Sequence, residues 1–247
     1  MRVALLADVH ANLEALTACL AHAREQGADA HAFLGDLVGY GADPVAVLEI
    51  VAEHVARGAV AVKGNHDEAV VEARGDLSSS AAQAVLWTRD RLSPAHHSFL
   101  AALPLAVRRD EVLFVHASAD APAAWTYVTD PVRAGRSLAA AEGARYVFSG
   151  HVHEPALYYA GPAQKPRGFH PVPGVAIPLT PRYRWLAIAG SAGQPRDGNT
   201  AACWALFDAE RATLTYHRVP YDWATAASKV RAAGLPEWLA HRLERGQ

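Results

Sequence analysis

The feature that most constrains the fold of this chain is a set of five short apolar segments, each followed directly by polar residues that can bind metal ions. The segments begin at Val3, Ala32, Ala59, Val112 and Tyr146. Short apolar segments bounded by glycine are typical of buried strands. Side chains at the carboxyl ends of such strands lie at the rim of an open sheet, where α/β proteins bind their ligands. The pattern therefore predicts a buried sheet with one polar rim.

The polar residues of that rim form a mixed set of nitrogen and oxygen ligands. They comprise four imidazoles, two carboxylates and one carboxamide: His10, His116, His151, His153, Asp8, Asp36 and Asn65. Such a set suits Mn, Fe, Zn, Co or Ni better than Mg or Ca, which prefer oxygen ligands. Seven ligands are too many for one tetrahedral ion but suit two ions that share a carboxylate. Two ions about 3.5–4 Å apart can activate a water and stabilise both oxygens of an in-line displacement at phosphorus.

Taken one at a time, these motifs have simpler explanations. A single Asp-x-His is usually a coincidence, a single Gly-Asp is a turn, and His116 alone is more often a satisfied or exposed histidine. The Gly-Asn-His-Asp motif at 64–67 could equally be a polar loop. The Gly-His-x-His motif at 150–153 is more specific, because the period of a strand points both imidazoles to one side. All five motifs in order, each after its own strand, favour a phosphoester-cleaving metal site.

The order of these motifs resembles that of the calcineurin-like metallophosphoesterase superfamily. The matching residues are Asp8-x-His10, Gly35-Asp36, Gly64-Asn65-His66-Asp67, His116 and Gly150-His151-x-His153. The segments 35–41 and 190–198 look like those of a group of small bacterial phosphoesterases. The resemblance implies an α/β (α+β) fold, a four-layer αββα sandwich in which two mixed β-sheets are flanked by helices. It implies a phosphodiesterase or another phosphoesterase as the activity.

The resemblance also divides the ligands between two metal ions. One ion would be held by Asp8, His10, Asp36 and His153, and the other by Asp36, Asn65, His116 and His151, with Asp36 as the bridge. A hydroxide bridging the ions would attack phosphorus. His66 would be the catalytic residue that faces the substrate, stabilises the phosphoryl oxygens and protonates the leaving oxygen, while Asp67 would support the loop. Manganese is the expected metal, with Fe, Zn, Co or Ni as alternatives.

The chain departs from the family pattern at two places, and the first departure narrows the range of expected activities. Ser/Thr protein phosphatases of the superfamily have Asp-Arg-Gly where this chain has Gly39-Tyr40-Gly41. This disfavours a protein phosphatase, another phosphomonoesterase or a dinucleoside polyphosphate hydrolase, which stay open as alternatives. A non-catalytic binding scaffold of the same fold is a further alternative, although such a scaffold would not need His66. Separately, Ala11 stands where the family commonly has glycine, which leaves the tightness of that turn open.

Length and composition predict a single domain, residues 1–247, with C-terminal helices at about 222–247 packed on it. The formal net charge of −2 gives no footprint for nucleic acid or membranes. The two cysteines, Cys19 and Cys203, are expected to be reduced, buried thiols of a cytoplasmic protein. No apolar stretch is long enough to span a membrane. The expected partner is a small phosphoester, for which a nucleotide is one candidate, and a homo-oligomer stays open.

Helices are predicted where capping residues precede apolar periodicity. The expected helices cover 12–26, 44–58, 78–92, 94–103 and 131–143, and the expected later strands cover 156–159, 185–189, 201–207 and 213–219. The segment 161–181, with several prolines, is predicted to be an ordered loop without helix. Its Lys165, Arg167 and His170 could meet phosphate or simply lie on the surface.

Three further side chains have two interpretations each. Trp125 and Tyr127 could stack on an aromatic part of the substrate, but packing of their own loop is favoured. Arg196 could bind phosphate as a bidentate donor, whereas a salt bridge within its turn is slightly favoured.

Overall fold

Two mixed β-sheets lie face to face in the computed structural model, which describes residues 1–72, 80–162 and 164–247. Within these residues each sheet has six strands. The first sheet has the order β3-β2-β1-β11-β12-β9, with β1 Arg2–Leu6, β2 Ala30–Phe33, β3 Val60–Ala61, β9 Ala176–Pro178, β11 Ala202–Asp208 and β12 Thr213–Val219. The second has the order β4-β5-β6-β10-β7-β8, with β4 Ala106–Arg109, β5 Val112–Val115, β6 Tyr146–Ser149, β7 Ala156–Ala160, β8 Arg167–Phe169 and β10 Arg184–Ile188.

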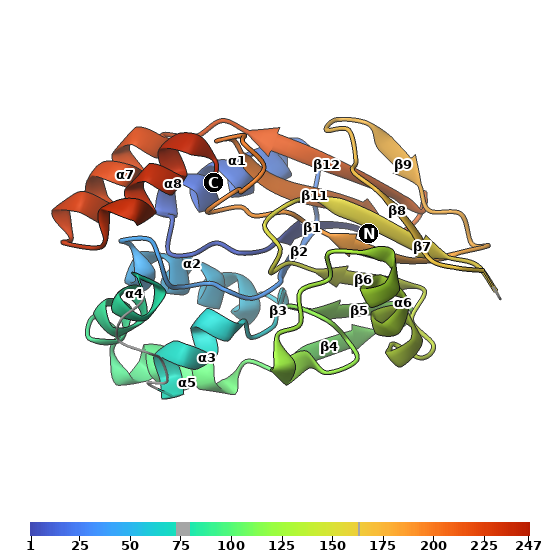
Figure 1. Cartoon of the computed structure of the whole chain (residues 1–247), viewed down its shortest axis with the longest axis horizontal. Coiled ribbons are helices and arrows are strands. Elements are labelled where there is room, and N and C mark those ends of the chain that lie inside the picture. Colours follow the sequence, from blue (N-terminus) through green and yellow to red (C-terminus); the bar gives the residue numbers. More distant parts are fainter. Residues whose placement is uncertain (73–79, 163) are drawn as a thin grey trace.

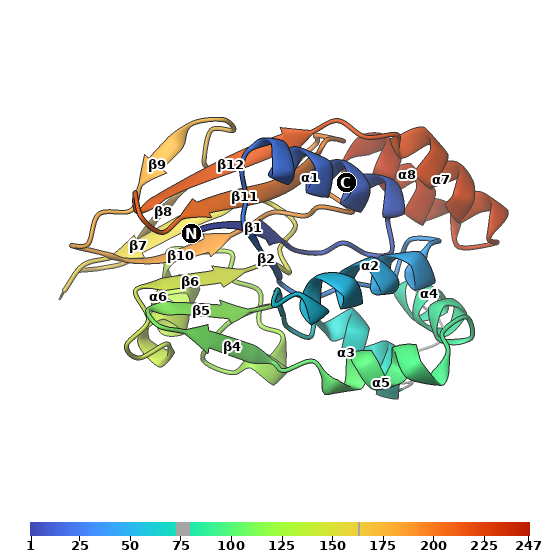
Figure 2. The ribbon, with the colours of Figure 1, turned by 180° about the vertical axis from the view of Figure 1, so that it is seen from behind.

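Helices cover the outer faces of the two sheets. Helices α1 (Leu13–Glu25) and α2 (Pro44–Ala56) pack on the first sheet, where Leu16 and Trp204 share one apolar cluster. Helix α6 (Pro131–Ala140) packs on the second sheet (Figure 1), and the view from behind shows α1 across β11 and β12 (Figure 2). A central cluster that includes Leu5, Phe148 and Phe207 fills the space between the sheets. The expected four-layer αββα sandwich is confirmed.

The parallel strands bring their carboxyl ends to one end of the sandwich. In the first sheet β1, β2 and β3 run parallel, and in the second sheet β5, β6 and β10 do so. Figure 1 shows that the chain leaves β1 and β2 toward the end of the molecule where α2, α3 (Asn65–Glu72), α7 and α8 gather. Parallel pairing therefore determines where the predicted polar rim lies.

Most predicted helices begin at the capping residues that the sequence indicates. The Asn12 side chain accepts a hydrogen bond from Ala15 N at 3.1 Å, and Gly27 follows α1 with a φ of +71°, the left-handed conformation that ends helices. Helix α5 is Pro94–Ala102, and Asp130 caps α6. Helix α4 is Ser80–Arg89, so the first two residues of the expected helix, 78–79, lie outside the described residues.

The C-terminal helices pack on the body close to the polar rim. Helices α7 (Trp223–Ala232) and α8 (Glu237–Arg245) bury Val230 and Leu239 in a cluster that also includes Ala84 of α4 and partly buried Tyr40. The predicted pair of C-terminal helices is confirmed. Its packing also brings residues from the last part of the sequence next to the loop that follows β2.

Some elements differ from expectation. Helix α3 begins inside the Gly-Asn-His-Asp motif, and the segment 161–181, predicted to be an ordered loop, contains β8 and β9. These two strands form sheet edges, where β8 pairs with β7 and β9 with β12. Three mostly exposed residues in each strand leave no alternation of apolar and polar positions to detect. Cys19 and Cys203 are free and buried, as expected. Among the described residues no helix is long and apolar enough to cross a membrane.

Candidate functional site

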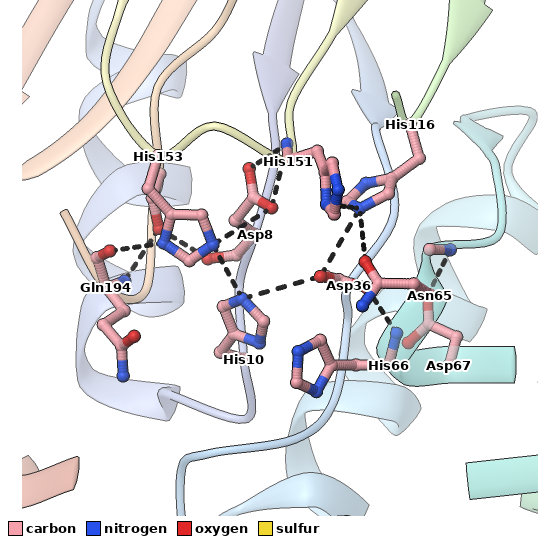
Figure 3. Close-up of polar contacts among 12 residues, drawn as sticks. Asp8, His10, Asp36, Asn65, His66, Asp67, His116, His151, His153 and Gln194 are labelled. Atoms are coloured by element: carbon pink, nitrogen blue, oxygen red, sulfur yellow. Dashed lines mark hydrogen bonds and ion pairs between the residues drawn. The ribbon is translucent and has the colours of Figure 1, made fainter. Parts of the chain in front are cut away.

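Seven predicted ligand residues meet where five strands end (Figure 3). Asp8 and His10 follow β1, Asp36 follows β2, Asn65 follows β3, His116 follows β5, and His151 and His153 follow β6. All except the half-buried Asn65 are at most 4 % exposed. Asp8, His10, Asp36, His151 and His153 have left-handed φ angles between 49° and 68°. Such backbone strain is typical of functional sites, where the surrounding structure holds it in place.

A first group of ligand atoms comes from Asp8, His10 and His153. The Nε2 atoms of His10 and His153 lie 3.1 Å apart, and His153 Nε2 lies 3.4 Å from Asp8 Oδ1. Burial is the main cause of the pKa of both imidazoles lying well below the usual value, so both rings are neutral near pH 7. Burial also raises the pKa of Asp8 to about 8. Two ring nitrogens that face each other beside a carboxylate are suited to share a cation.

A second group comes from Asp36, His116 and His151, with Asn65 beside it. His116 Nε2 lies 3.4 Å from Asp36 Oδ2, 3.1 Å from His151 Nδ1 and 3.2 Å from Asn65 Oδ1. Burial lowers the pKa of His116, but the charge of Asp36, its hydrogen bond to His116 and the charge of Asp8 together outweigh burial and raise the pKa to about 9. The carboxylate therefore favours positive charge at this position, as a metal ligand group does.

Asp36 lies between the two groups. Its Oδ2 atom is 3.7 Å from His10 Nε2 and 3.4 Å from His116 Nε2, so one carboxylate oxygen faces a nitrogen of each group. Its Oδ1 atom accepts a hydrogen bond from the backbone N–H of His66 at 2.8 Å. Burial would raise the pKa of Asp36, yet the neighbouring imidazoles of His116 and His66 hold it well below its usual value. The arrangement can accommodate two cations that share this carboxylate.

Each ligand imidazole is oriented by a backbone carbonyl on its other side. The contacts are His10 Nδ1 to Val38 O at 3.2 Å, His116 Nδ1 to Leu34 O at 2.7 Å, His151 Nε2 to Trp125 O at 2.9 Å and His153 Nδ1 to Gln194 O at 2.6 Å. An N–H that donates to a carbonyl fixes the tautomer and leaves the opposite nitrogen free to bind a metal. His10, His151 and His153 therefore present a lone pair to the centre of the site, and His116 would present one after a cation displaces its Nε2 proton. This arrangement fits the predicted pair of transition-metal ions.

Asp67 supports the loops that carry the ligands, as expected. Its Oδ1 accepts hydrogen bonds from Leu37 N at 2.9 Å and Val38 N at 3.2 Å, and its Oδ2 accepts one from Gly64 N at 2.9 Å. These amides belong to the segments directly after Asp36 and directly before Asn65. The carboxylate therefore joins the β2 and β3 ligand loops to each other.

His66 lies beside the ligand groups and packs between two rings. Its ring centroid is 4.9 Å from that of His10 and 4.4 Å from that of Tyr40. Its Nδ1 atom is buried and has no hydrogen-bond partner among the described residues. Burial is the first cause of its lowered pKa. A ligand atom of His66 also lies within 4.8 Å of those of His10 and Asp36, so the geometry allows it to approach a metal as well as a substrate.

The loop after β5 packs against the metal-ligand imidazoles. Trp125 bonds His151 through its carbonyl oxygen, and its indole Nε1 donates to Glu68 Oε2 at 3.1 Å. The ring of Tyr127 stacks on that of His151 with a centroid distance of 3.9 Å. Both residues pack against the candidate site, which agrees with the favoured interpretation, while stacking of Tyr127, 48 % exposed, on a substrate stays a prediction. At the β1 turn, Ala11 keeps the tight conformation despite its side chain, with a φ of +53°.

Two residues of the segment 190–198, Gln194 and Arg196, have contacts that the sequence did not predict. Gln194 was not singled out by the sequence, yet its carbonyl oxygen orients His153. A backbone carbonyl can come from any residue type, so no sequence signal marks it. The favoured salt bridge of Arg196 within its turn is wrong, because in the described part of the chain Arg196 bonds Gln194 Oε1 and the neighbouring Asp197 pairs with Arg218. The sequence alone cannot show that the adjacent carboxylate has another partner.

Comparisons with known proteins agree with this geometry. The model of the calcineurin-like phosphoesterase superfamily domain matches residues 1–212. An uncharacterized protein of Methanocaldococcus jannaschii is 32 % identical over 255 residues, with 99 % of this chain and 98 % of that protein covered. The crystal structure of a metallophosphoesterase from Sphaerobacter thermophilus is similar with a TM-score of 0.88 and 34 % identity, covering 100 % and 99 % of the two chains. A hypothetical protein from Pyrococcus horikoshii shares the fold with a TM-score of 0.78 at 19 % identity, covering 100 % and 98 %.

Proposed function

The chain belongs to the calcineurin-like phosphoesterase superfamily, and from this premise we propose that it is a dinuclear metal-dependent hydrolase of small phosphodiesters. The observation that carries the proposal is the position of Asp36 Oδ2, 3.7 Å from a nitrogen of the first ligand group and 3.4 Å from a nitrogen of the second. A carboxylate in this position is suited to bridge two ions. We also propose that residues 1–247 act as one domain.

The residues proposed to hold the ions follow from the two groups. Asp8, His10, Asp36 and His153 would hold one ion, and Asp36, Asn65, His116 and His151 the other. When bound, two such ions supply Lewis-acid charge stabilisation and an activated water. The mixed nitrogen and oxygen set favours a transition metal such as manganese. Asp67 keeps the two ligand loops in register through its three backbone hydrogen bonds.

His66 is the proposed catalytic residue. It follows Asn65 directly and is held between the rings of His10 and Tyr40, so its side chain has one defined orientation. Gly39 permits the close packing behind it, because a Cβ there would lie 2.7 Å from His66 Nδ1. Burial lowers its pKa, so the neutral ring keeps one N–H that can donate to a phosphoryl or leaving oxygen.

A preference for diesters over monoesters follows from the surroundings of His66. A phosphomonoester carries more negative charge on its phosphoryl oxygens than a diester does. The uncharged ring of Tyr40 packs on His66 at 4.4 Å, in the segment where related protein phosphatases have Asp-Arg-Gly. The immediate neighbours of His66 thus add no positive charge from that segment, which suits a singly charged phosphodiester.

The test compares hydrolysis of bis-p-nitrophenyl phosphate and p-nitrophenyl phosphate by metal-stripped protein reloaded with Mn²⁺. We expect faster turnover of the diester, and a decrease in kcat of about 10²–10⁴-fold in His66→Ala, the usual effect of removing an acid–base group. His96→Ala is the matched control, because His96 is half-buried and bonds Ser93 at the start of α5.

Each other outcome has a defined meaning. Preference for the monoester would replace the diesterase by a phosphomonoesterase. An unchanged rate in His66→Ala would remove that residue from catalysis. No turnover of either substrate by protein with two bound metal ions would favour the non-catalytic scaffold.

A further inference from the structure

Two arginine side chains meet beside the first ligand group without a carboxylate partner. Arg196 comes from the segment 190–198 and Arg242 from helix α8. Arg196 Nη2 donates to Gln194 Oε1 at 3.0 Å, and Arg242 Nη1 donates to the same oxygen at 3.1 Å. One amide oxygen therefore holds two guanidinium groups next to each other. We name Arg196 and Arg242 the arginine pair.

The arginine pair keeps most of its hydrogen-bonding capacity free. A guanidinium has five N–H donors. In the described part of the chain Arg196 bonds only Gln194, whereas Arg242 bonds Gln194 and also the hydroxyl of Tyr40. The Nε atoms of both are buried and have no partner among the described residues. Buried donors that protein groups leave unsatisfied are costly, which is a reason to expect a ligand that accepts from them.

Nearby carboxylates are engaged elsewhere. Asp197, next to Arg196, pairs with Arg218. Glu244, on the same helix as Arg242, pairs with Arg231. Among the described residues no ion pair includes either member of the arginine pair. Two adjacent positive charges therefore stand uncompensated, and burial first and the charge of Arg196 second lower the pKa of Arg242.

The arginine pair is connected to the catalytic centre. Gln194 holds both guanidinium groups with its side chain and orients His153 with its carbonyl oxygen. Tyr40, whose ring packs on His10 and His66, has the Cζ of Arg196 at 5.7 Å and that of Arg242 at 6.0 Å from its centroid.

The charge of Arg196 also reaches the catalytic centre. Burial is the main cause of the lowered pKa of His10, His66 and His153, and the charge of Arg196 lowers all three further. Figure 3 shows Gln194 on the side of His10 and His153 that faces away from His116. The pair therefore lies beside one end of the ligand set and not between the two groups.

We propose that the arginine pair binds a second phosphate group of the substrate, so that the natural substrate is a small phosphoester with a further phosphate on its organic part. Guanidinium groups bind phosphate with bidentate, charge-assisted hydrogen bonds. An anion here accepts from the free donors and relieves the repulsion between the two charges. Helix α8, which supplies Arg242, lies beyond residues 1–212, the part matched by the family model, whereas Arg196 lies within that part. The inference rests on the proposed function, because it names the substrate class of the same site.

The test measures binding and needs no turnover. Calorimetry on Mn²⁺-loaded protein compares propylphosphonate with propane-1,3-bisphosphonate, whose P–C bonds are not hydrolysed and which differ by one phosphonate group. We expect the bisphosphonate to bind at least about tenfold more tightly to the wild type, the effect of one charged hydrogen-bonded contact. Arg196→Met and Arg242→Met should each lower this preference by about threefold, and the double variant should lose it entirely.

Two further variants distinguish phosphate binding by the arginine pair from a purely structural role of the two side chains. Methionine keeps part of the apolar stem of Arg242, whose guanidinium Cζ lies 4.7 Å from the centroid of the Trp238 ring. Arg242→Lys should retain part of the preference because it keeps the charge. Arg245→Met, an exposed position on the same helix, should leave the preference unchanged. Circular dichroism and metal content establish that each variant is folded and loaded.

Two results would overturn the proposal. Equal affinity of the wild type for both phosphonates would show that no second phosphate site exists. An equal loss of affinity for both phosphonates in the arginine variants would show that the pair binds the reacting phosphoryl group. Hydrolysis of the simple diester is measured separately, so failure of the proposed function and failure of this inference can be distinguished.

Discussion

Asn12 joins three parts of the chain that the catalytic centre depends on, and its replacement tests how much this connection stabilises the protein. The side chain is buried, and its Oδ1 caps α1 by accepting from Ala15 N at 3.1 Å. Its Nδ2 donates to Gly193 O at 2.7 Å and to Tyr221 Oη at 3.2 Å. Asn12 thus connects the loop after β1, the turn that contains Gln194, and the entry to α7.

The expected loss in Asn12→Ala has two contributions. Removing an N-cap costs about 1 kcal/mol, within a range of about 0.5–2. Leaving the buried Gly193 carbonyl without its donor costs about 1–3 kcal/mol more. We therefore expect the free energy of unfolding to fall by about 3 kcal/mol. Asn12→Ser should lose about 2 kcal/mol, because serine caps helices well but is too short to replace the donor to Gly193.

Urea denaturation of metal-free protein measures these losses without the contribution of metal binding. The control is Asp222→Ala, which removes the exposed N-cap of α7, where Asp222 Oδ1 accepts from Thr225 N at 2.9 Å. It should lose about 1 kcal/mol, the cap contribution alone. A loss in Asn12→Ala no larger than in Asp222→Ala would refute the reasoning, since the bond to Gly193 would then add nothing.

Three further changes have defined outcomes. Asp36→Asn should lower the content of both metal ions, measured by elemental analysis; full occupancy would contradict a bridging role. Gly193→Ala should lower the Tm, because its Cβ would lie 1.8 Å from Val9 O; an unchanged Tm would mean that the turn moves freely. Burial first and His54 second lower the pKa of His31 to about 4 from its usual 6.5. The unfolded chain therefore binds this proton at a higher pH than the folded chain does. The free energy of unfolding should fall as the pH decreases from 6.5 to about 4. His31→Gln should lose less stability between pH 7 and pH 5 in urea titrations, and an equal loss would assign the acid sensitivity to other groups.

The centre of the site could be predicted because each ligand is marked twice. Its residue type identifies the chemistry, and an apolar segment before it identifies the strand end. Parallel pairing of β1 with β2 and of β5 with β6 then brings these strand ends together. The order of strands and helices along the sequence is enough to suggest this parallel pairing. Helix caps such as Asn12 and Asp130 were predictable for the same reason, since the side chain that marks the helix start also forms its first hydrogen bond.

The surroundings of the site could not be predicted in the same way. The carbonyl groups that orient the imidazoles, such as that of Gln194, depend on backbone position and not on residue type. The salt bridge expected for Arg196 fails because the competing partner of Asp197 is Arg218, 21 positions along the chain. The contact between Gln194 and Arg242 joins residues 48 positions apart and depends on how α8 packs, which periodicity within α8 does not reveal.

The metal ligands and the arginine pair therefore come from different parts of the sequence. The ligands come from five strand ends of the sandwich, which the resemblance to related phosphoesterases covers. The arginine pair is assembled by the segment 190–198 and α8, which meet at Gln194 and share Tyr40 as a neighbour. Because Tyr40 packs both on His66 and in the cluster formed by α7 and α8, the C-terminal helices are in contact with the catalytic centre. Substrate selection can therefore change through α8 while the metal ligands stay the same.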